Sequence, residues 1–165
     1  MNRAGRFFFC SQDLKRTLFI FAFFCGTFFH SNARASSGIT YHGRIIKPDG
    51  VTPVTSATTQ FLIQVRSPSN NCLLWQEQQS KNLSASNGAF SVTIADTSEP
   101  SLVPNALPFT LERVFSNRTN FTGLSGCTAG TSYNPSPTDG RSLQVYFREN
   151  PGDPWELMPL IKVNY

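Results

Sequence analysis

Side chains that commonly carry out catalysis are scarce beyond residue 35 of this sequence. His42 is the only histidine there, so any Ser-His-Asp triad would have to use it. It stands between Thr40 and Arg44 in an alternating run, where we expect an exposed sheet residue. Gly123-Leu124-Ser125-Gly126-Cys127 is similar to a nucleophile elbow, but its last residue is Cys and no strand–turn–helix pattern surrounds it. We therefore predict no catalytic residue and no enzyme.

Candidate metal ligands are equally sparse. Three aspartates lie in turns beside Pro or Gly, namely Asp49, Asp139 and Asp153. No acidic run has the ligand spacing of a Ca²⁺ loop. A structural zinc site needs four ligands, and only His42 could join Cys72 and Cys127. We predict no metal and no cofactor.

The first 35 residues have the three parts of a secretory leader. A basic start is followed by an apolar run from Leu18 to Phe29 and then by Ala33-Arg34-Ala35. The alternative is an uncleaved membrane anchor, but an apolar run of about 12 residues is short for a span, which needs about 20. We expect cleavage between Ala35 and Ser36, and hence an extracellular, cell-surface or periplasmic protein.

Removing this leader changes the charge of the chain. The full chain has 14 basic and 10 acidic residues, and five of the basic and one of the acidic residues lie before Ser36. The mature part therefore carries nine of each and has no net charge. Since nucleic-acid binding needs a clustered basic face, we predict no nucleic-acid partner.

The cysteines divide in the same way. Cys10 and Cys25 belong to the leader, whereas Cys72 and Cys127 remain, 55 residues apart. An even pair in an oxidising compartment predicts one disulfide, with two free thiols as the alternative. Closing a loop of this length stabilises a fold by about 4 kcal/mol in the chain-entropy treatment.

The elements that must position these residues are mostly strands. All 11 prolines lie after residue 35, which suits short strands joined by turns. We expect strands over residues 39–45, 58–67, 72–80, 90–95, 143–147 and 155–165. Residues 109–116 predict a short helix capped by Thr110, with a strand over residues 110–115 as the competing interpretation. Residues 97–108 and 117–140 read as loops. The sequence thus predicts one domain over residues 36–165, an antiparallel β-sandwich of about six to eight strands.

Several short motifs follow one another in a distinctive order. They are Ile39-Thr40-Tyr41-His42-Gly43-Arg44-Ile45, Pro48-Asp49-Gly50, Phe61-x-Ile63-x-Val65, Cys72-Leu73-Leu74-Trp75-x-Glu77, Asn87-Gly88-Ala89-Phe90-Ser91-Val92, Asp139-Gly140-Arg141-x-Leu143 and Trp155-Glu156-Leu157. In this order they resemble the N-terminal β-sandwich module of long, secreted fibre-like proteins of predatory bacteria, of the cell-wall-anchor or phage-tail-fibre-like kind. The resemblance spans nearly all of residues 37–165. It implies the base domain of a trimeric surface fibre or adhesin that contacts other cell surfaces.

Proteins of that kind continue past the module into a repetitive shaft and tip, whereas this sequence stops at Tyr165. The resemblance therefore implies a base domain truncated before any binding tip. Two other classes are alternatives. One is a small secreted enzyme or inhibitor domain. The other is a small outer-membrane β protein, which short strands interrupted by proline disfavour.

The C-terminal residues predict where the domain would associate. Ile161, Val163 and Tyr165 alternate in an apolar strand with only Lys162 as a charge between them. If this strand lies at a sheet edge, its unpaired N–H and C=O groups can recruit another strand. We expect self-association there, as a homotrimer or by strand pairing, or contact with a cell-surface component. A monomer would need this strand to be central, or covered by the loop over residues 97–108.

Overall fold

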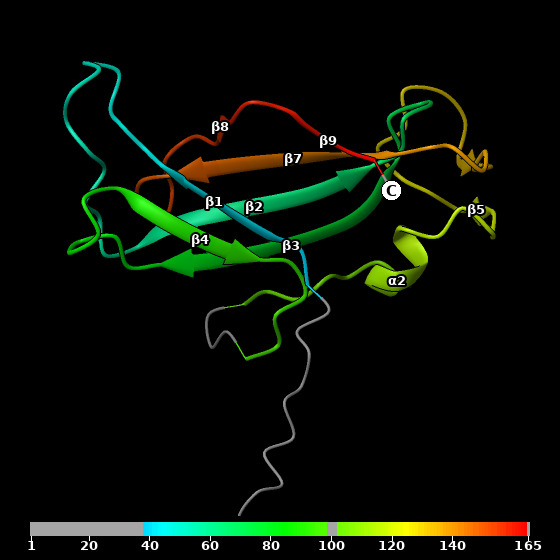
Figure 1. Ribbon diagram of the computed structural model, residues 1–165, viewed down its shortest axis with the longest axis horizontal. Coiled ribbons are helices and arrows are strands. Elements are labelled where there is room, and N and C mark those ends of the chain that lie inside the picture. The colour runs from blue at the N-terminus through cyan, green and yellow to red at the C-terminus, as the bar shows by residue number, and fades with distance from the viewer. Residues whose placement is uncertain (1–37, 99–101, 165) are drawn as a thin grey trace, which may run out of the picture. The chain divides into compact units, whose positions relative to one another are not determined.

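The computed structural model describes residues 38–98 and 102–164 of the chain (Figure 1). The predicted leader, its cleavage site at Ala33, Ala35 and Ser36, and Tyr165 lie outside the described residues. The described part is mostly β, with antiparallel sheets and one short helix. Its elements are β1 (Thr40–Arg44), β2 (Thr59–Arg66), β3 (Leu73–Lys81), β4 (Ala89–Thr93), α2 (Leu111–Val114), β5 (Phe121–Thr122), β6 (Ser132–Tyr133), β7 (Arg141–Arg148), β8 (Glu156–Leu157) and β9 (Ile161–Val163).

The largest sheet is built around β2, which lies between β3 and β7. Strands β8 and β9 then pair one after the other with the far side of β7. The predicted alternation of β2 is confirmed, because Phe61, Ile63 and Val65 are fully buried. These side chains belong to the hydrophobic core.

Leu73, Leu74 and Trp75 are three consecutive apolar residues at the start of β3, and a bulge accounts for this break in the alternation. Arg66 pairs with Leu73 and Val65 pairs with Trp75, so that Leu74 is an extra residue between the two pairs. Such a bulge lets consecutive apolar residues sit in one strand. Leu74 is fully buried as a result.

A two-stranded sheet of β1 and β4 lies across β2 and β3 (Figure 1). The ring centroid of Phe90 on β4 is 4.7 Å from that of Phe61 on β2, which places the core between the two sheets. The same ring covers Gly43 of β1, where an added Cβ would be 3.0 Å from the ring. Phe90 thus fills the space that Gly43 leaves open.

The predicted helix and its cap are confirmed. Thr110 has extended backbone angles, and its side-chain oxygen accepts a hydrogen bond from the N–H of Arg113. The helix is shorter than expected, since it covers four residues. No helix of the described residues is long and apolar enough to cross a membrane.

The expected loop over residues 117–140 contains a small hairpin that the sequence did not reveal. Strands β5 and β6 pair through Phe121–Tyr133 and Thr122–Ser132. The rings of Phe121 and Tyr133 stack at 5.8 Å, and Phe109 meets Phe121 edge-on at 5.2 Å. This aromatic cluster gives the long connection its own buried centre.

The prediction of one continuous strand over residues 155–165 is wrong about its continuity. Its described part is two short strands, β8 and β9, separated by residues 158–160. Pro159 lies in that interruption and has no N–H to donate to a ladder. Both pieces still pair with β7.

Candidate functional site

The predicted association edge is formed by β9. Ile161 and Val163 lie opposite the first residues of β7 and are half-buried against the core, whereas Lys162 is exposed. Their side chains therefore face inward, and it is the backbone of β9 that a partner could pair with. Tyr165, the third residue predicted at this edge, lies outside the described residues.

Residues 102–105 cover the opposite edge of the sheet, along β3. Gln78 and Val103 exchange backbone hydrogen bonds of 3.1 and 2.7 Å, and the N–H of Gln76 donates to the side chain of Asn105 at 3.1 Å. Within the described ranges, no strand or loop pairs with the outer side of β9. Among the described residues, one edge of the sheet is thus covered (the closed edge) and the other is not (the open edge).

Apolar side chains accompany the open edge. Leu157 on β8 is 58% exposed, and Leu160, just before β9, is 51% exposed. Large apolar residues that stand in solvent beside unpaired backbone are a frequent mark of an interaction surface. The open edge therefore offers both hydrogen-bonding groups and apolar area.

A buried arginine holds the start of β7, against which β9 pairs. Arg141 is 2% exposed, and its guanidinium donates to the carbonyls of Val114 at 2.7 Å, Gly140 at 2.9 Å and Ser116 at 3.2 Å, and to the hydroxyl of Tyr133 at 3.0 Å. One side chain thus joins the end of α2, strand β6 and strand β7. The Asp-Gly-Arg motif of the sequence is a structural anchor.

Asp139 extends this anchor to the neighbouring turn. Its carboxylate accepts hydrogen bonds from the N–H of Ser136 at 3.0 Å and from the hydroxyl of Tyr133 at 2.8 Å. These two bonds, the Ser136 bond first, hold the pKa of Asp139 below its ordinary value. The charged form of Asp139 is therefore the one that fits the folded turn.

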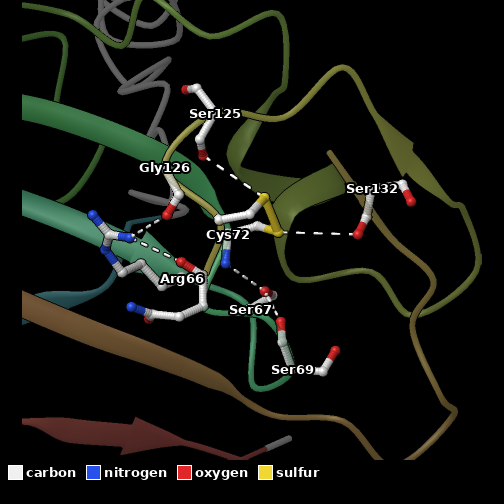
Figure 2. Close-up of a disulfide and its surroundings, with 9 residues drawn as sticks. Arg66, Ser67, Ser69, Cys72, Ser125, Gly126 and Ser132 are labelled. Atoms are coloured by element: carbon white, nitrogen blue, oxygen red, sulfur yellow. Dashed lines mark hydrogen bonds between the residues drawn. A yellow bond between two sulfur atoms is a disulfide. The ribbon is translucent and has the colours of Figure 1, made fainter. Parts of the chain in front are cut away.

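The predicted disulfide between Cys72 and Cys127 is present (Figure 2). It attaches the loop around residues 123–128 to the β2–β3 hairpin. Backbone contacts reinforce it, because the N–H of Leu73 donates to the carbonyl of Ser125 at 3.2 Å. Arg66 donates to the carbonyls of Asn71 and Gly126 at 2.8 and 3.1 Å. The hairpin and the loop are thus joined by one disulfide and by several hydrogen bonds.

His42 and Ser125, the two residues of the catalytic motifs named above, lie in different parts of the fold. His42 is exposed on β1, as expected, and lies opposite Ser91 of β4. Ser125 belongs to the disulfide loop, where its carbonyl accepts a sheet-type hydrogen bond. In residues 38–98 and 102–164, no three His, Cys, Asp or Glu side chains gather in a way that could hold a metal ion.

A buried acid, Glu77, is the feature that sequence reasoning missed. It is 2% exposed on β3, and its carboxylate accepts hydrogen bonds from the indole of Trp75, the backbone N–H of Ala95 and the amide of Gln79. Ala95, which supplies the backbone donor at 2.9 Å, has a positive φ of 61°. No basic side chain of the described residues forms an ion pair with Glu77. The glutamate is held by three neutral donors instead.

Glu77 lies at an apolar pocket of about 330 Å³ between β3 and the segment that leads to α2. Trp75, Leu107 and Phe109 form part of its wall. Alternating sequence could have marked Glu77 as inward, since it occupies the same face as Trp75. A charged side chain is seldom buried without partners, and the three donors that allow it here come together only in the folded chain.

Comparisons of the chain with protein-family models, with curated proteins and with solved structures gave no match.

Proposed function

We propose that this protein is an exported structural or interaction module that associates with further copies of itself through the open edge at β9. In this proposal residues 36–165 form a small β-sandwich, with the β1–β4 pair as one layer and the sheet around β2 as the other. The leader is removed after Ala35, and the domain works outside the cytoplasm, at the cell surface or in the periplasm.

The observation that carries the proposal is the contrast between the two edges of the main sheet. Along β3, residues 102–105 occupy the edge with backbone and side-chain hydrogen bonds. Along β9 the described residues supply no such cover, and Leu157 and Leu160 stand exposed beside it. An uncovered edge favours pairing with another strand, because this satisfies its N–H and C=O groups.

Two further features support the setting. A disulfide between residues 55 apart persists in oxidising compartments, in agreement with the expected leader. The order of motifs resembles the base module of trimeric surface fibres, in which the chain would pass from this strand into an intertwined shaft. The partner is accordingly a second and third copy of the chain, or a cell-surface component. The proposal assigns no catalytic role.

Mass in solution tests the association. We expect light scattering at high micromolar concentration to give a mass above that of a monomer, and Leu160→Lys to lower it. The matched control is Val103→Lys, which changes an exposed apolar residue at the closed edge and is expected to leave the mass unchanged. Deleting residues 161–165, or replacing Val163 with Lys, tests the strand itself. A parent that is strictly monomeric, or variants that all remain oligomeric, would refute the proposed edge.

A further inference from the structure

The outer face of the main sheet, on the side away from β1 and β4, carries ordered amide side chains. Cross-strand register places Gln64 beside Gln76 and Gln144, and Gln60 beside Arg148. The amide of Gln64 donates to the oxygen of Gln76 at 2.6 Å, and Arg148 donates to the oxygen of Gln60 at 2.7 Å. These bonds fix the amides in place on a sheet surface.

In these bonds the amides of three residues act as acceptors through their oxygens. Tyr146 donates to the oxygen of Gln144 at 3.0 Å, so the oxygens of Gln60, Gln76 and Gln144 are all engaged. The NH₂ groups of these three residues have no hydrogen-bond partner among the described residues. Each can donate two hydrogen bonds to a ligand.

Rings and apolar side chains form a row between the amides. Leu62, Tyr146 and Leu157 are neighbours in register across β2, β7 and β8. Beside them the guanidinium carbon of Arg148 lies 4.4 Å above the ring of Trp155. At the β3 end the row continues into a groove of about 300 Å³, where Val103 forms one wall. The face is therefore extended, and it alternates apolar and amide positions.

The charged side chains at the outward positions of this face are all basic. Its outward positions in β2, β3, β7, β8 and β9 include Arg66, Arg148 and Lys162, and none of them is Asp or Glu. The mature chain carries equal numbers of acids and bases, so the acids are placed elsewhere. Two copies packed by these faces would bring like charges together, which disfavours a second copy as the occupant. A partner with acidic groups is complementary.

We propose that the outer face binds an acidic polysaccharide, that is, an extended sugar chain with carboxylate substituents. Sugar hydroxyls accept hydrogen bonds from the fixed NH₂ groups, and the carboxylates pair with Arg148 and Lys162. Tyr146 and Trp155 offer flat apolar surface with polar tips, which suits a ligand that is apolar on its ring faces and polar at its rim. The proposed ligand contacts outward side chains, including that of Lys162 on β9, whereas strand pairing uses the backbone of β9. A negative result for one of these proposals therefore does not decide the other.

Calorimetric titration of the purified protein with polygalacturonate tests the proposal, and the fully methyl-esterified polymer serves as the uncharged counterpart. We expect binding to the acidic polymer, weaker binding as salt is raised, and at least about tenfold weaker binding to the esterified polymer. Arg148→Gln should weaken binding at least about tenfold, since it removes a charged donor. Lys162→Gln removes a second charge from the face without a side-chain hydrogen bond being lost in the described fold, and should also weaken binding.

Arg118→Gln is the matched control, because Arg118 is exposed and lies outside this face. It makes the same change in net charge and should leave affinity unchanged. The proposal is overturned if polygalacturonate does not bind, if the esterified polymer binds equally well, or if Arg118→Gln weakens binding as much as the two face variants. Melting curves of each variant confirm that a loss of binding occurs in folded protein.

Discussion

Glu77 shows how a charged residue can be accommodated in the core without a counter-charge. Both carboxylate oxygens accept hydrogen bonds, from one donor on one oxygen and two donors on the other. Those donors come from β3 itself and from the backbone just after β4. The acid therefore ties the edge of one sheet to the end of the other.

Replacing Glu77 with Gln should destabilise the fold although the side chain keeps its shape. An amide has only one acceptor oxygen, so at least one of the three donors loses its partner. We expect the free energy of unfolding to fall by about 1–3 kcal/mol, the cost of an unsatisfied buried polar group. Urea unfolding at neutral pH measures this. Unchanged stability would mean that the three bonds contribute little.

The stability of the fold should fall in acid partly because of Asp139. Its pKa is lowered in the folded state, so the folded protein resists protonation more than the unfolded chain does. The contribution of Asp139 is present above the ordinary value of 3.8 and is lost as pH falls below it. Asp49 and Asp96, whose pKa values are also lowered by hydrogen bonds, add to the same slope.

Asp139→Asn should therefore flatten, without abolishing, the fall in unfolding free energy between about pH 5 and pH 2. Thr138→Ala, an exposed change one residue away, should leave the slope as it is. Chemical unfolding at a series of pH values gives both slopes. Parallel curves for the parent and Asp139→Asn would contradict the role assigned to this carboxylate.

At the scale of elements, the disulfide joins a loop to a hairpin that already hold each other by hydrogen bonds. Changing both Cys72 and Cys127 to Ser should lower the free energy of unfolding by about 2–5 kcal/mol. The remaining bonds, including that from Thr128 N–H to the Asn70 carbonyl at 2.7 Å, should keep the loop near its place. Calorimetry measures the loss. A reducing agent should lower the melting temperature of the parent and leave that of the double variant unchanged.

The attachment of β9 depends on a glycine. A Cβ added at Gly140 would lie 2.6 Å from the carbonyl oxygen of Val163 and 2.6 Å from the side-chain oxygen of Asn164. Gly140→Ala should therefore push the end of β9 away from β7, at a cost of about 1–3 kcal/mol. We expect faster hydrogen exchange at residues 161–163 while β2 stays protected. Ser142→Ala, also at the start of β7, is the control, and equal exchange in both variants would count against this contact.

At the scale of the whole molecule, the proposed export of the chain can be tested directly. The disulfide and the neutral charge of residues 36–165 both agree with a chain that loses a basic leader. We predict that N-terminal sequencing of the exported protein begins at Ser36, because small residues at positions −1 and −3 from that point suit the leader peptidase. Mature protein that still begins at Met1 would overturn this.

The sequence by itself determined the elements whose signals are local. Period-two alternation placed β1, β2, β4 and β7 and identified their inward faces, because successive side chains in a strand point to opposite sides. Thr110 marked the start of α2, and a single cysteine pair after the leader left one possible partner for Cys72. The leader and the fibre-like resemblance remain predictions from sequence.

Tertiary structure alone decided which edge is closed, how the acid and the arginine are buried, and how the chain ends. A monomer was expected to need the loop over residues 97–108 as a cover for the C-terminal strand, whereas the described part of that loop lies along β3, where Val103 and Gln78 pair across 25 residues of sequence. The guanidinium of Arg141 donates to the carbonyl of Val114 on α2, which lies 27 residues earlier in the sequence. Such contacts join residues that are distant in sequence, so no local pattern predicts them. A buried polar side chain is stable only where the fold supplies its hydrogen-bond partners. The open edge and the amide face follow from the same assembly, because a strand's neighbours determine what it leaves exposed.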